Sequence, residues 1–185
     1  DTVTMLAEDD DLAPRTRQAL QSELRSVIDR QQDAEAAVAA IRSVRRRELF
    51  RIAADALVLK APVDTTGAAL TDVAVASVEA ALAVVRQQHD PDSLVEFAIV
   101  GMGRFGGGEL GFGSDIDVMF VFRAREGVED EQAQRVASTV ATELRKALMA
   151  PSGDPPIDID ADLRPEGRQG PLVRSLDSFA SYYER

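Results

Sequence analysis

Residues 101–117 read Gly-Met-Gly-Arg-Phe-Gly-Gly-Gly-Glu-Leu-Gly-Phe-Gly-Ser-Asp-Ile-Asp, a glycine-rich stretch that ends in two aspartates separated by one residue. The stretch joins two short apolar runs, residues 96–102 and 115–122, and each run is typical of a buried strand. Side chains two residues apart on a strand point to the same face, so Asp115 and Asp117 are expected to lie side by side. The sequence therefore predicts a glycine-rich connection between two strands, with a pair of carboxylates at the start of the second strand.

This pair of carboxylates predicts a metal site. Two carboxylates a few ångströms apart repel each other unless a cation lies between them. Oxygen donors of this kind suit Mg²⁺ or Mn²⁺, which proteins hold with a few carboxylates together with substrate phosphates. Just upstream, Gly106 and Gly107 give a backbone that could approach a phosphate closely and direct its N–H groups at it. Ser114 adds a hydroxyl beside the first aspartate.

A third carboxylate is expected on a neighbouring strand. The segment 157–163 alternates apolar and acidic residues, which favours a strand with one face turned to a site. Asp158, Asp160 and Asp162 would all lie on that face of a regular strand, and periodicity does not choose among them, although Asp160 is well placed. Three carboxylates could hold two metal ions for a phosphoryl transfer, and the third could accept the proton of the attacking hydroxyl. Arg164 comes directly after this segment and could reach a triphosphate.

The first 92 residues predict a helical subdomain, because apolar residues recur there at helical spacing. One helix is expected to begin near Leu12, after the acidic residues 9–11, where negative charge favours a helix N-terminus. Turn-forming residues in the segment 61–67 predict a break before a further helix that ends near Gln88.

Residues 93–185 form the predicted catalytic core, in which a long helix over residues 130–149 separates the second strand from the third. The expected fold class is α+β: a small mixed sheet with flanking helices, preceded by the helical subdomain. The chain starts with Asp1 and has no initiator methionine, so we expect a fragment of a longer chain.

Composition excludes several classes of protein. A net charge of −11 disfavours a nucleic-acid polymerase or a tRNA nucleotidyltransferase, because binding to a phosphate backbone needs a basic surface. The absence of cysteine excludes a disulfide framework and a cysteine-based zinc site. Neither a membrane-spanning run nor a signal peptide is evident, so we expect a cytoplasmic protein that binds no membrane.

The order of strand, glycine pair, Asp-x-Asp, helix and acidic strand resembles that of nucleotidyltransferases related to DNA polymerase beta. Residues 101–121 resemble more closely the signature of the glutamine-synthetase adenylyltransferases, approximately G-x-G-[KR]-x-G-G-x-E-L-x-x-x-S-D-x-D. Residues 160–173, Asp-Ala-Asp-Leu-Arg-Pro-Glu-Gly-Arg-Gln-Gly-Pro-Leu-Val, resemble a second phrase of that family, D-x-x-L-R-P-x-G-x-x-G-x-L-V. Tyr182 and Tyr183 also fit the family pattern on the C-terminal side of that phrase. One departure is Asp162, where many members of the family carry Arg.

The resemblance implies a role for each matched residue. It implies a metal-binding catalytic triad of Asp115, Asp117 and Asp160, and so selects Asp160 on the third strand. It also assigns five residues to the nucleotide: Arg104, Gly106, Gly107, Ser114 and Arg164.

The resemblance further implies a reaction. Enzymes of this family attach AMP from ATP to a tyrosine of glutamine synthetase in one domain, and remove it by phosphorolysis, releasing ADP, in another. Residues 109–114 and 163–167 look more like the C-terminal, adenylylating copy of actinobacterial members. The implied function is adenylylation that regulates nitrogen assimilation, with glutamine synthetase as protein substrate and a PII-type signalling protein as a further partner. The alternatives are phosphorolytic removal of AMP and a catalytically inert nucleotide-sensing module, which three intact aspartates disfavour.

Overall fold

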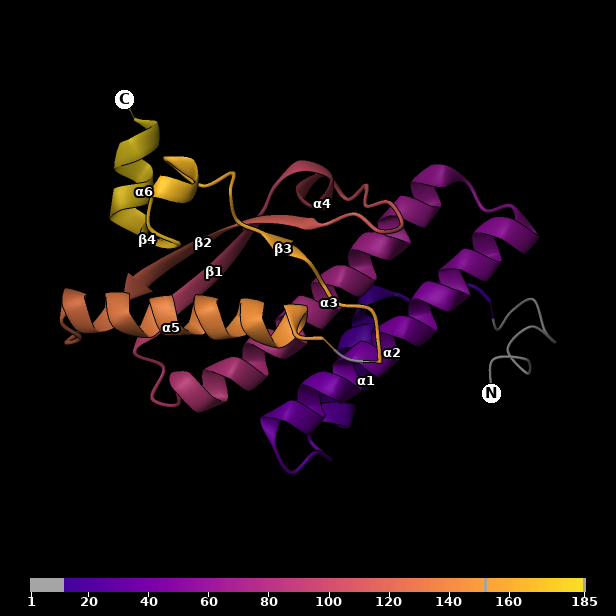
Figure 1. The fold of residues 1–185 in the computed structure, drawn as a ribbon, viewed down its shortest axis with the longest axis horizontal. Helices are drawn as coiled ribbons and strands as arrows, with labels where there is room; N and C mark the ends of the chain where they lie inside the picture. The colour runs from indigo at the N-terminus through magenta and orange to yellow at the C-terminus, as the bar shows by residue number, and fades with distance from the viewer. Residues whose placement is uncertain (1–11, 152, 185) are drawn as a thin grey trace. The chain divides into compact units, whose positions relative to one another are not determined.

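The computed structural model describes residues 12–151 and 153–184 of the chain, which divides into two compact units (Figure 1). The first unit contains the residues through Ala81 together with residues 108–114 and 151–156. The second contains residues 82–107, residues 115–150 and the chain from residue 157 onward. The domain boundary expected after residue 92 stays a prediction, whereas the compact units divide inside a long helix, between Ala81 and Leu82.

Helices make up most of the first unit. α1 (Arg17–Ile28) contacts α2 (Ala34–Ala54), and η3 (Asp55–Leu59), a short π-helical segment, continues α2. Thr16 and Asp33 cap α1 and α2, because each side chain accepts a hydrogen bond from the backbone N–H three residues further on. The helix expected near Leu12 begins only at Arg17, and the acidic residues 9–11 lie outside the described residues.

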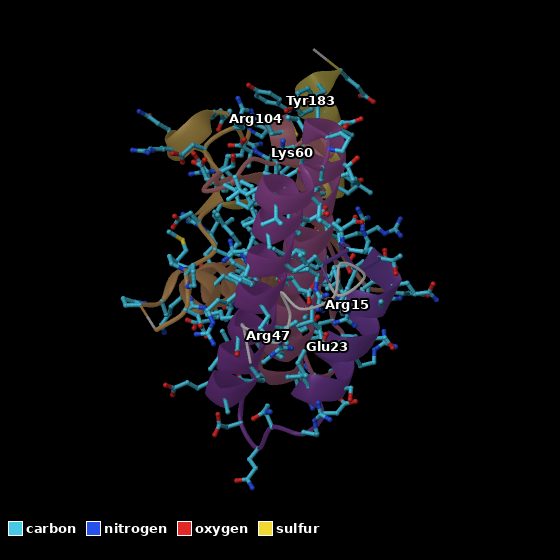
Figure 2. The ribbon with its side chains drawn as sticks, turned by 90° about the vertical axis from the view of Figure 1, so that its right-hand side faces the viewer. Arg15, Glu23, Arg47, Lys60, Arg104 and Tyr183 are labelled. Atoms are coloured by element: carbon cyan, nitrogen blue, oxygen red, sulfur yellow. The ribbon has the colours of Figure 1, made fainter. Side chains whose placement is uncertain are left out.

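Ion pairs connect α1 to α2 around Glu48, a glutamate whose side chain is 2 % exposed. Arg15 and Arg51 approach its two carboxylate oxygens at 3.7 Å and 3.3 Å. Glu23 of α1 pairs with Arg15 and, at 2.7 Å, with Arg47 of α2 (Figure 2). Burial raises the pKa of Glu48, and the neighbouring Arg51 and Arg15 partly offset that effect. A buried carboxylate costs free energy unless it is paired, so these contacts hold the two helices in one register.

α3 (Val63–His89) begins inside the segment that was expected to form a turn. The predicted turn over residues 61–67 is therefore wrong, because Gly67 lies within the helix. A side-chain carbon at Gly67 would lie 3.3 Å from the Cα atom of Glu109 and 3.4 Å from the carbonyl oxygen of Leu110. The backbone N–H of Leu110 donates a hydrogen bond to the Thr71 hydroxyl at 3.2 Å. Gly67 thus contacts residues 108–114, and its lack of a side chain allows the two backbones to approach closely.

α3 is also long and apolar enough to cross a membrane, by length and composition alone, whereas no such run was expected from the sequence. In the structure, 61 % of its most apolar stretch is buried within the protein. Ala81, Val84 and Val85 are among its buried residues. This burial is typical of a core helix.

A four-stranded mixed sheet forms the centre of the second unit. β1 (Val95–Gly101) pairs antiparallel with β2 (Ile116–Ala124). Two short strands, β3 (Ile159–Asp160) and β4 (Val173–Ser175), pair parallel with β2 on its other edge, β3 at the start of β2 and β4 further along. The expected α+β fold, with a small mixed sheet and flanking helices, is confirmed.

Helices lie on both sides of this sheet. α5 (Asp130–Met149) runs along one face, whereas α4 (Gly103–Gly107) and α6 (Leu176–Tyr183) lie on the other side (Figure 1). The buried side of α5 includes Val140, Leu144 and Leu148, all fully inaccessible to solvent. Burial of this apolar face stabilises the unit, at about 25 cal/mol per Å² of apolar surface.

Two predicted elements differ in extent from the structure. The third strand, expected over residues 157–163, contains only Ile159 and Asp160, because a carboxylate oxygen of Asp160 accepts a hydrogen bond from the backbone N–H of Asp162 at 2.7 Å and starts a turn. The glycine-rich connection is not all loop, since its first residues form α4.

We expect Gly67→Val to destabilise the first unit. The branched side chain would press on the backbone at Glu109 and Leu110, and such overpacking costs about 1–3 kcal/mol. The measurement is the free energy of unfolding from urea denaturation. Ala68→Val, at an exposed position of the same helix, serves as the matched control and should change stability by less than about 1 kcal/mol. Equal stabilities for the two variants would contradict the assigned contact.

Candidate active site

Strand pairing brings two of the predicted aspartates together. Asp117 on β2 and Asp160 on β3 are direct partners in the parallel pair, so their side chains leave the same face of the sheet. Asp115 stands two residues before Asp117 and directly before the start of β2, and its negative charge acts on the Asp117 carboxylate. Of the three acidic candidates on the third segment, only Asp160 is a strand partner of Asp117, because Asp158 and Asp162 lie outside β3.

The negative charges of Asp115 and Asp160 act on the carboxylate of Asp117. The pKa of Asp117 is raised above its usual value, first by burial of the carboxylate and then by the negative charges of Asp115 and Asp160. Like charges disfavour the ionised form of each group, so this face of the sheet favours the approach of a proton or a cation.

The donor set fits a hard divalent cation in its chemistry. The carboxylates of Asp115, Asp117 and Asp160 match the kind of ligand preferred by Mg²⁺ and Mn²⁺. As they stand, no three acidic, histidine or cysteine side chains among residues 12–151 and 153–184 are grouped closely enough to hold a metal ion. Neighbouring strands are only about 4.8 Å apart, so rotation of side chains is enough to bring the carboxylates of Asp117 and Asp160 together.

Gly103, at the start of α4, makes room for the central aspartate. A side-chain carbon at this position would lie 2.6 Å from the Asp117 carboxylate oxygen Oδ2, closer than any real contact of that kind. Gly103 also has a φ of +51°, a left-handed conformation that favours glycine. The backbone N–H of Met102 donates a hydrogen bond to the Asp117 carbonyl at 2.8 Å. Together these contacts fix the start of α4 beside Asp117, a role for Gly103 that was not predicted from the sequence.

The predicted phosphate-binding glycines differ in their surroundings. A side-chain carbon at Gly106 would lie 2.4 Å from the carbonyl oxygen of Gly101, so Gly106 allows α4 to pack against the end of β1. The same carbon at Gly107 would meet no atom within 4 Å. Gly106 therefore has a packing role in the protein itself, whereas Gly107 borders open space that a ligand could fill.

Arg104 is an exposed cation next to this site. It lies directly after Gly103 on α4, and its guanidinium makes no hydrogen bond or ion pair with any residue that the structure describes (Figure 2). An unpaired arginine close to the carboxylates is suited to an anionic ligand such as a phosphate.

Ser114 belongs to the first compact unit and directly precedes Asp115 in the chain. Its hydroxyl accepts a hydrogen bond from the backbone N–H of Gly111 at 3.2 Å, and its own N–H donates to the Gly111 carbonyl. The hydroxyl that was predicted to hold phosphate therefore closes a turn in this structure. A phosphate contact from the same hydroxyl stays a prediction.

Arg164 is occupied by the loop after β3. Its side chain is 11 % exposed, its Nη1 group donates to the Ala161 carbonyl at 2.7 Å, and its Nε group donates to the Gly170 carbonyl at 3.2 Å. The predicted contact of Arg164 with a triphosphate would require some of these hydrogen bonds to break. Its observed contacts fold the segment that carries Asp160.

Asp162, the departure from the family phrase, binds two arginines. Its carboxylate accepts hydrogen bonds from Arg168 Nε at 2.6 Å and from Arg164 Nη1 at 3.3 Å, and these contacts lower its pKa. Arg168 is 86 % exposed, and the charge of Asp160 contributes to its raised pKa. A second exposed cation thus stands near the carboxylates. Arg168 was not predicted as a site residue, and its place in the second phrase was the only signal for it in the sequence.

Comparison of the sequence with known proteins finds a matching family and similar relatives, all described as adenylyltransferases. A family profile described as "Glutamate-ammonia ligase adenylyltransferase" matches residues 2–185. A "Bifunctional glutamine synthetase adenylyltransferase/adenylyl-removing enzyme" of Streptomyces avermitilis is 47 % identical over 188 residues, covering 94 % of this chain and 19 % of that enzyme. Enzymes of the same name from Streptomyces coelicolor and Leifsonia xyli subsp. xyli are 48 % and 40 % identical, with 94 % and 100 % of this chain covered. The chain spans about a fifth of the length of these relatives.

The two glycines of α4 are expected to respond differently to alanine. Gly106→Ala should lower the free energy of unfolding by about 1–3 kcal/mol, because the new carbon would collide with the Gly101 carbonyl. Gly107→Ala meets no neighbour and should leave stability unchanged or raise it by up to about 1 kcal/mol. Urea denaturation of both variants measures the difference. A Gly106→Ala variant as stable as the parent chain would refute the close approach.

Removing one negative charge from the site should stabilise the metal-free protein. The pKa of Asp117 is raised in the folded state. Its contribution to the stability of the fold is therefore fully present below the unfolded pKa, about 3.9, and is lost as pH rises through the folded pKa. Above that pH, Asp117→Asn should be more stable than the parent chain, by about 0.5–2 kcal/mol. Thermal unfolding of both proteins from pH 4 to pH 8, without divalent cations, measures this difference. If the difference in stability between Asp117→Asn and the parent chain were the same at pH 4 and at pH 8, that result would contradict the predicted repulsion.

Proposed function

We propose, from the premise that the chain belongs to the glutamate–ammonia ligase adenylyltransferase family, that it transfers AMP from ATP to a tyrosine of glutamine synthetase. The observation that supports this proposal is the strand pairing of Asp117 with Asp160, together with the negative charge of Asp115 just before β2. A divalent cation, Mg²⁺ or Mn²⁺, held by these carboxylates would supply charge stabilisation at the α-phosphate.

Residues around the carboxylates have distinct proposed roles. The substrate hydroxyl forms a bond to the α-phosphorus of ATP as the bond to pyrophosphate breaks. Asp160 accepts the proton of that hydroxyl, since the strand pairing sets it beside the central aspartate. Arg104 is free to bind the phosphates, and the open space at Gly107 leaves its backbone accessible to them. Ser114 and Arg164 contribute only if they exchange contacts within the protein for contacts with the nucleotide.

A second candidate function has support from the relatives, which are named for both adenylyl transfer and adenylyl removal. Removal of AMP by phosphorolysis would use the same three aspartates, with phosphate as the attacking group and ADP as product. We propose a cytoplasmic location for either activity, with glutamine synthetase as the protein substrate and a PII-type protein as a regulator. No nucleic acid or membrane takes part in this proposal, in keeping with the net charge of −11.

The test is incubation of the chain with purified glutamine synthetase, Mg²⁺ and α-labelled ATP, and then measurement of label on the synthetase. The parent chain should transfer label, and Asp160→Asn should reduce the rate at least about a hundredfold, because it removes a metal ligand and the proton acceptor. Asp158→Asn is the matched control: its exposed side chain lies outside β3, so the rate should be unchanged.

The same proteins also separate the two candidate functions. If the parent chain fails to label the synthetase but releases ADP from the AMP-bearing synthetase in the presence of phosphate, the chain is the removing copy. Equal transfer by the Asp158→Asn and Asp160→Asn variants would refute the assignment of Asp160.

A further inference from the structure

The face of the sheet that carries the aspartates continues as an apolar surface. Met119 and Val121 come after Asp117 at two-residue intervals on β2, so they belong to the same face, where both side chains are buried. Their antiparallel partners on β1 are Val100 and Ala98, of which Val100 is half-buried and Ala98 is exposed. No charged group comes from these four residues. The surface begins about 7 Å along β2 from Asp117, the length of two residues in a strand.

Tyr183, near the end of α6, contacts this surface. Its hydroxyl donates a weak hydrogen bond to the sulfur of Met119 at 3.8 Å, while the residue as a whole remains 57 % exposed (Figure 2). The second compact unit thus presents an exposed aromatic ring that contacts the residue two positions after Asp117 on β2. α6 lies on the same side of the sheet as α4, the helix that carries Arg104 (Figure 1).

Neighbouring side chains hold Tyr183 in place. Its ring centroid lies 5.0 Å from that of Phe179 and 5.2 Å from that of Tyr182, and the latter pair is edge-to-face. The Arg174 guanidinium in turn lies 5.6 Å from the Tyr182 ring centroid. The Tyr183 ring, held by Phe179, Tyr182 and Met119, loses little conformational entropy when a ligand stacks on it.

Arg174 itself is fixed within the protein. Its side chain is 12 % exposed, it pairs with Glu166 at 2.9 Å, and it donates a hydrogen bond to the Ser178 hydroxyl at 3.1 Å. It therefore supports the Tyr182 ring, and Tyr183 is the more exposed of the two tyrosines, at 57 % against 39 %.

We propose that Tyr183, with the exposed Ala98 and the half-buried Val100 of β1, forms the subsite for the purine base of the nucleotide whose phosphates lie at the aspartates. This inference rests on the proposed function and adds a base-binding residue to it. An aromatic face and apolar side chains suit a flat base, and a charged phosphate would find no partner there. The ribose would span the distance between the carboxylates and the ring.

The composition of the chain supplies a direct reporter for this proposal. Tyr182 and Tyr183 are the only tyrosines, and the chain has no tryptophan, so its intrinsic fluorescence comes from these two rings. Tyr182→Phe and Tyr183→Phe each leave one tyrosine. ATP with Mg²⁺, corrected for absorption by the base, should quench the fluorescence of Tyr182→Phe and leave that of Tyr183→Phe nearly unchanged. Inorganic tripolyphosphate, which has no base, should quench neither variant.

Calorimetry with the same ligands measures how much the Tyr183 ring contributes to the affinity for ATP. Tyr183→Ala should bind ATP about fivefold to a hundredfold more weakly, the usual effect of losing one base-stacking ring, and should bind tripolyphosphate as the parent chain does. Tyr183→Phe keeps the ring and should retain the affinity for ATP. Unchanged affinity of Tyr183→Ala for ATP would overturn the subsite, as would an equal loss for ATP and tripolyphosphate.

The proposed function can fail independently of this subsite. If the parent chain binds ATP with Mg²⁺ but transfers no AMP and removes none, the proposed function fails while the tyrosine variants still decide the subsite. If the parent chain binds neither ATP nor tripolyphosphate, both proposals are overturned.

Discussion

Repulsion among three carboxylates is the constraint on which the second unit depends. The parallel pairing of β2 with β3 sets Asp160 directly beside Asp117, and Asp115, just before β2, adds a third negative charge that acts on Asp117. A fold held together only by burial of apolar surface would gain nothing from this arrangement, because each charge raises the cost of ionising the others. The arrangement is understandable as a site that is completed by positive charge, from a metal ion and from arginines such as Arg104 and Arg168.

The glycines around this site serve packing as much as ligand binding. Gly103 gives space to the Asp117 carboxylate, and Gly106 lets α4 approach the end of β1. In the first unit, Gly67 of α3 likewise lets the backbone of residues 108–114 approach closely. Close approaches of this kind leave no room for a side chain at these glycines. Of the two glycines predicted to bind phosphate, Gly107 is the one that borders open space, as Gly108 and Gly113 also do.

Much of this architecture could be predicted from the sequence. The alternation of Asp115, Ile116 and Asp117 in an apolar run identified β2 and its acidic face, and helical periodicity identified the long helices. The third strand was overestimated, because only two residues pair and the Asp160 side chain then starts a turn, a local hydrogen bond that alternation cannot reveal. Residue periodicity alone could not choose Asp160 over Asp158 or Asp162, since register is a long-range property of two strands.

Other features depend on contacts between distant residues and were outside the reach of sequence patterns. The segment 61–67 has the composition of a turn, but Gly67 lies inside α3, where the backbone of residues 108–114 approaches it closely. Arg164 has the character of a phosphate ligand, yet its hydrogen bonds to backbone carbonyls show that it also folds the loop after β3. The position of Tyr183 beside Met119 likewise depends on how α6 returns to the sheet after β4.

The central claim is that Asp115, Asp117 and Asp160 together hold divalent metal at the α-phosphate of a nucleotide. Anomalous diffraction from a crystal grown with Mn²⁺ and an unreactive ATP analogue tests it most directly. The account predicts a manganese peak about 2 Å from carboxylate oxygens of these aspartates and from a phosphate oxygen of the analogue. A bound analogue with manganese elsewhere, or with no manganese at the three aspartates, would contradict the account.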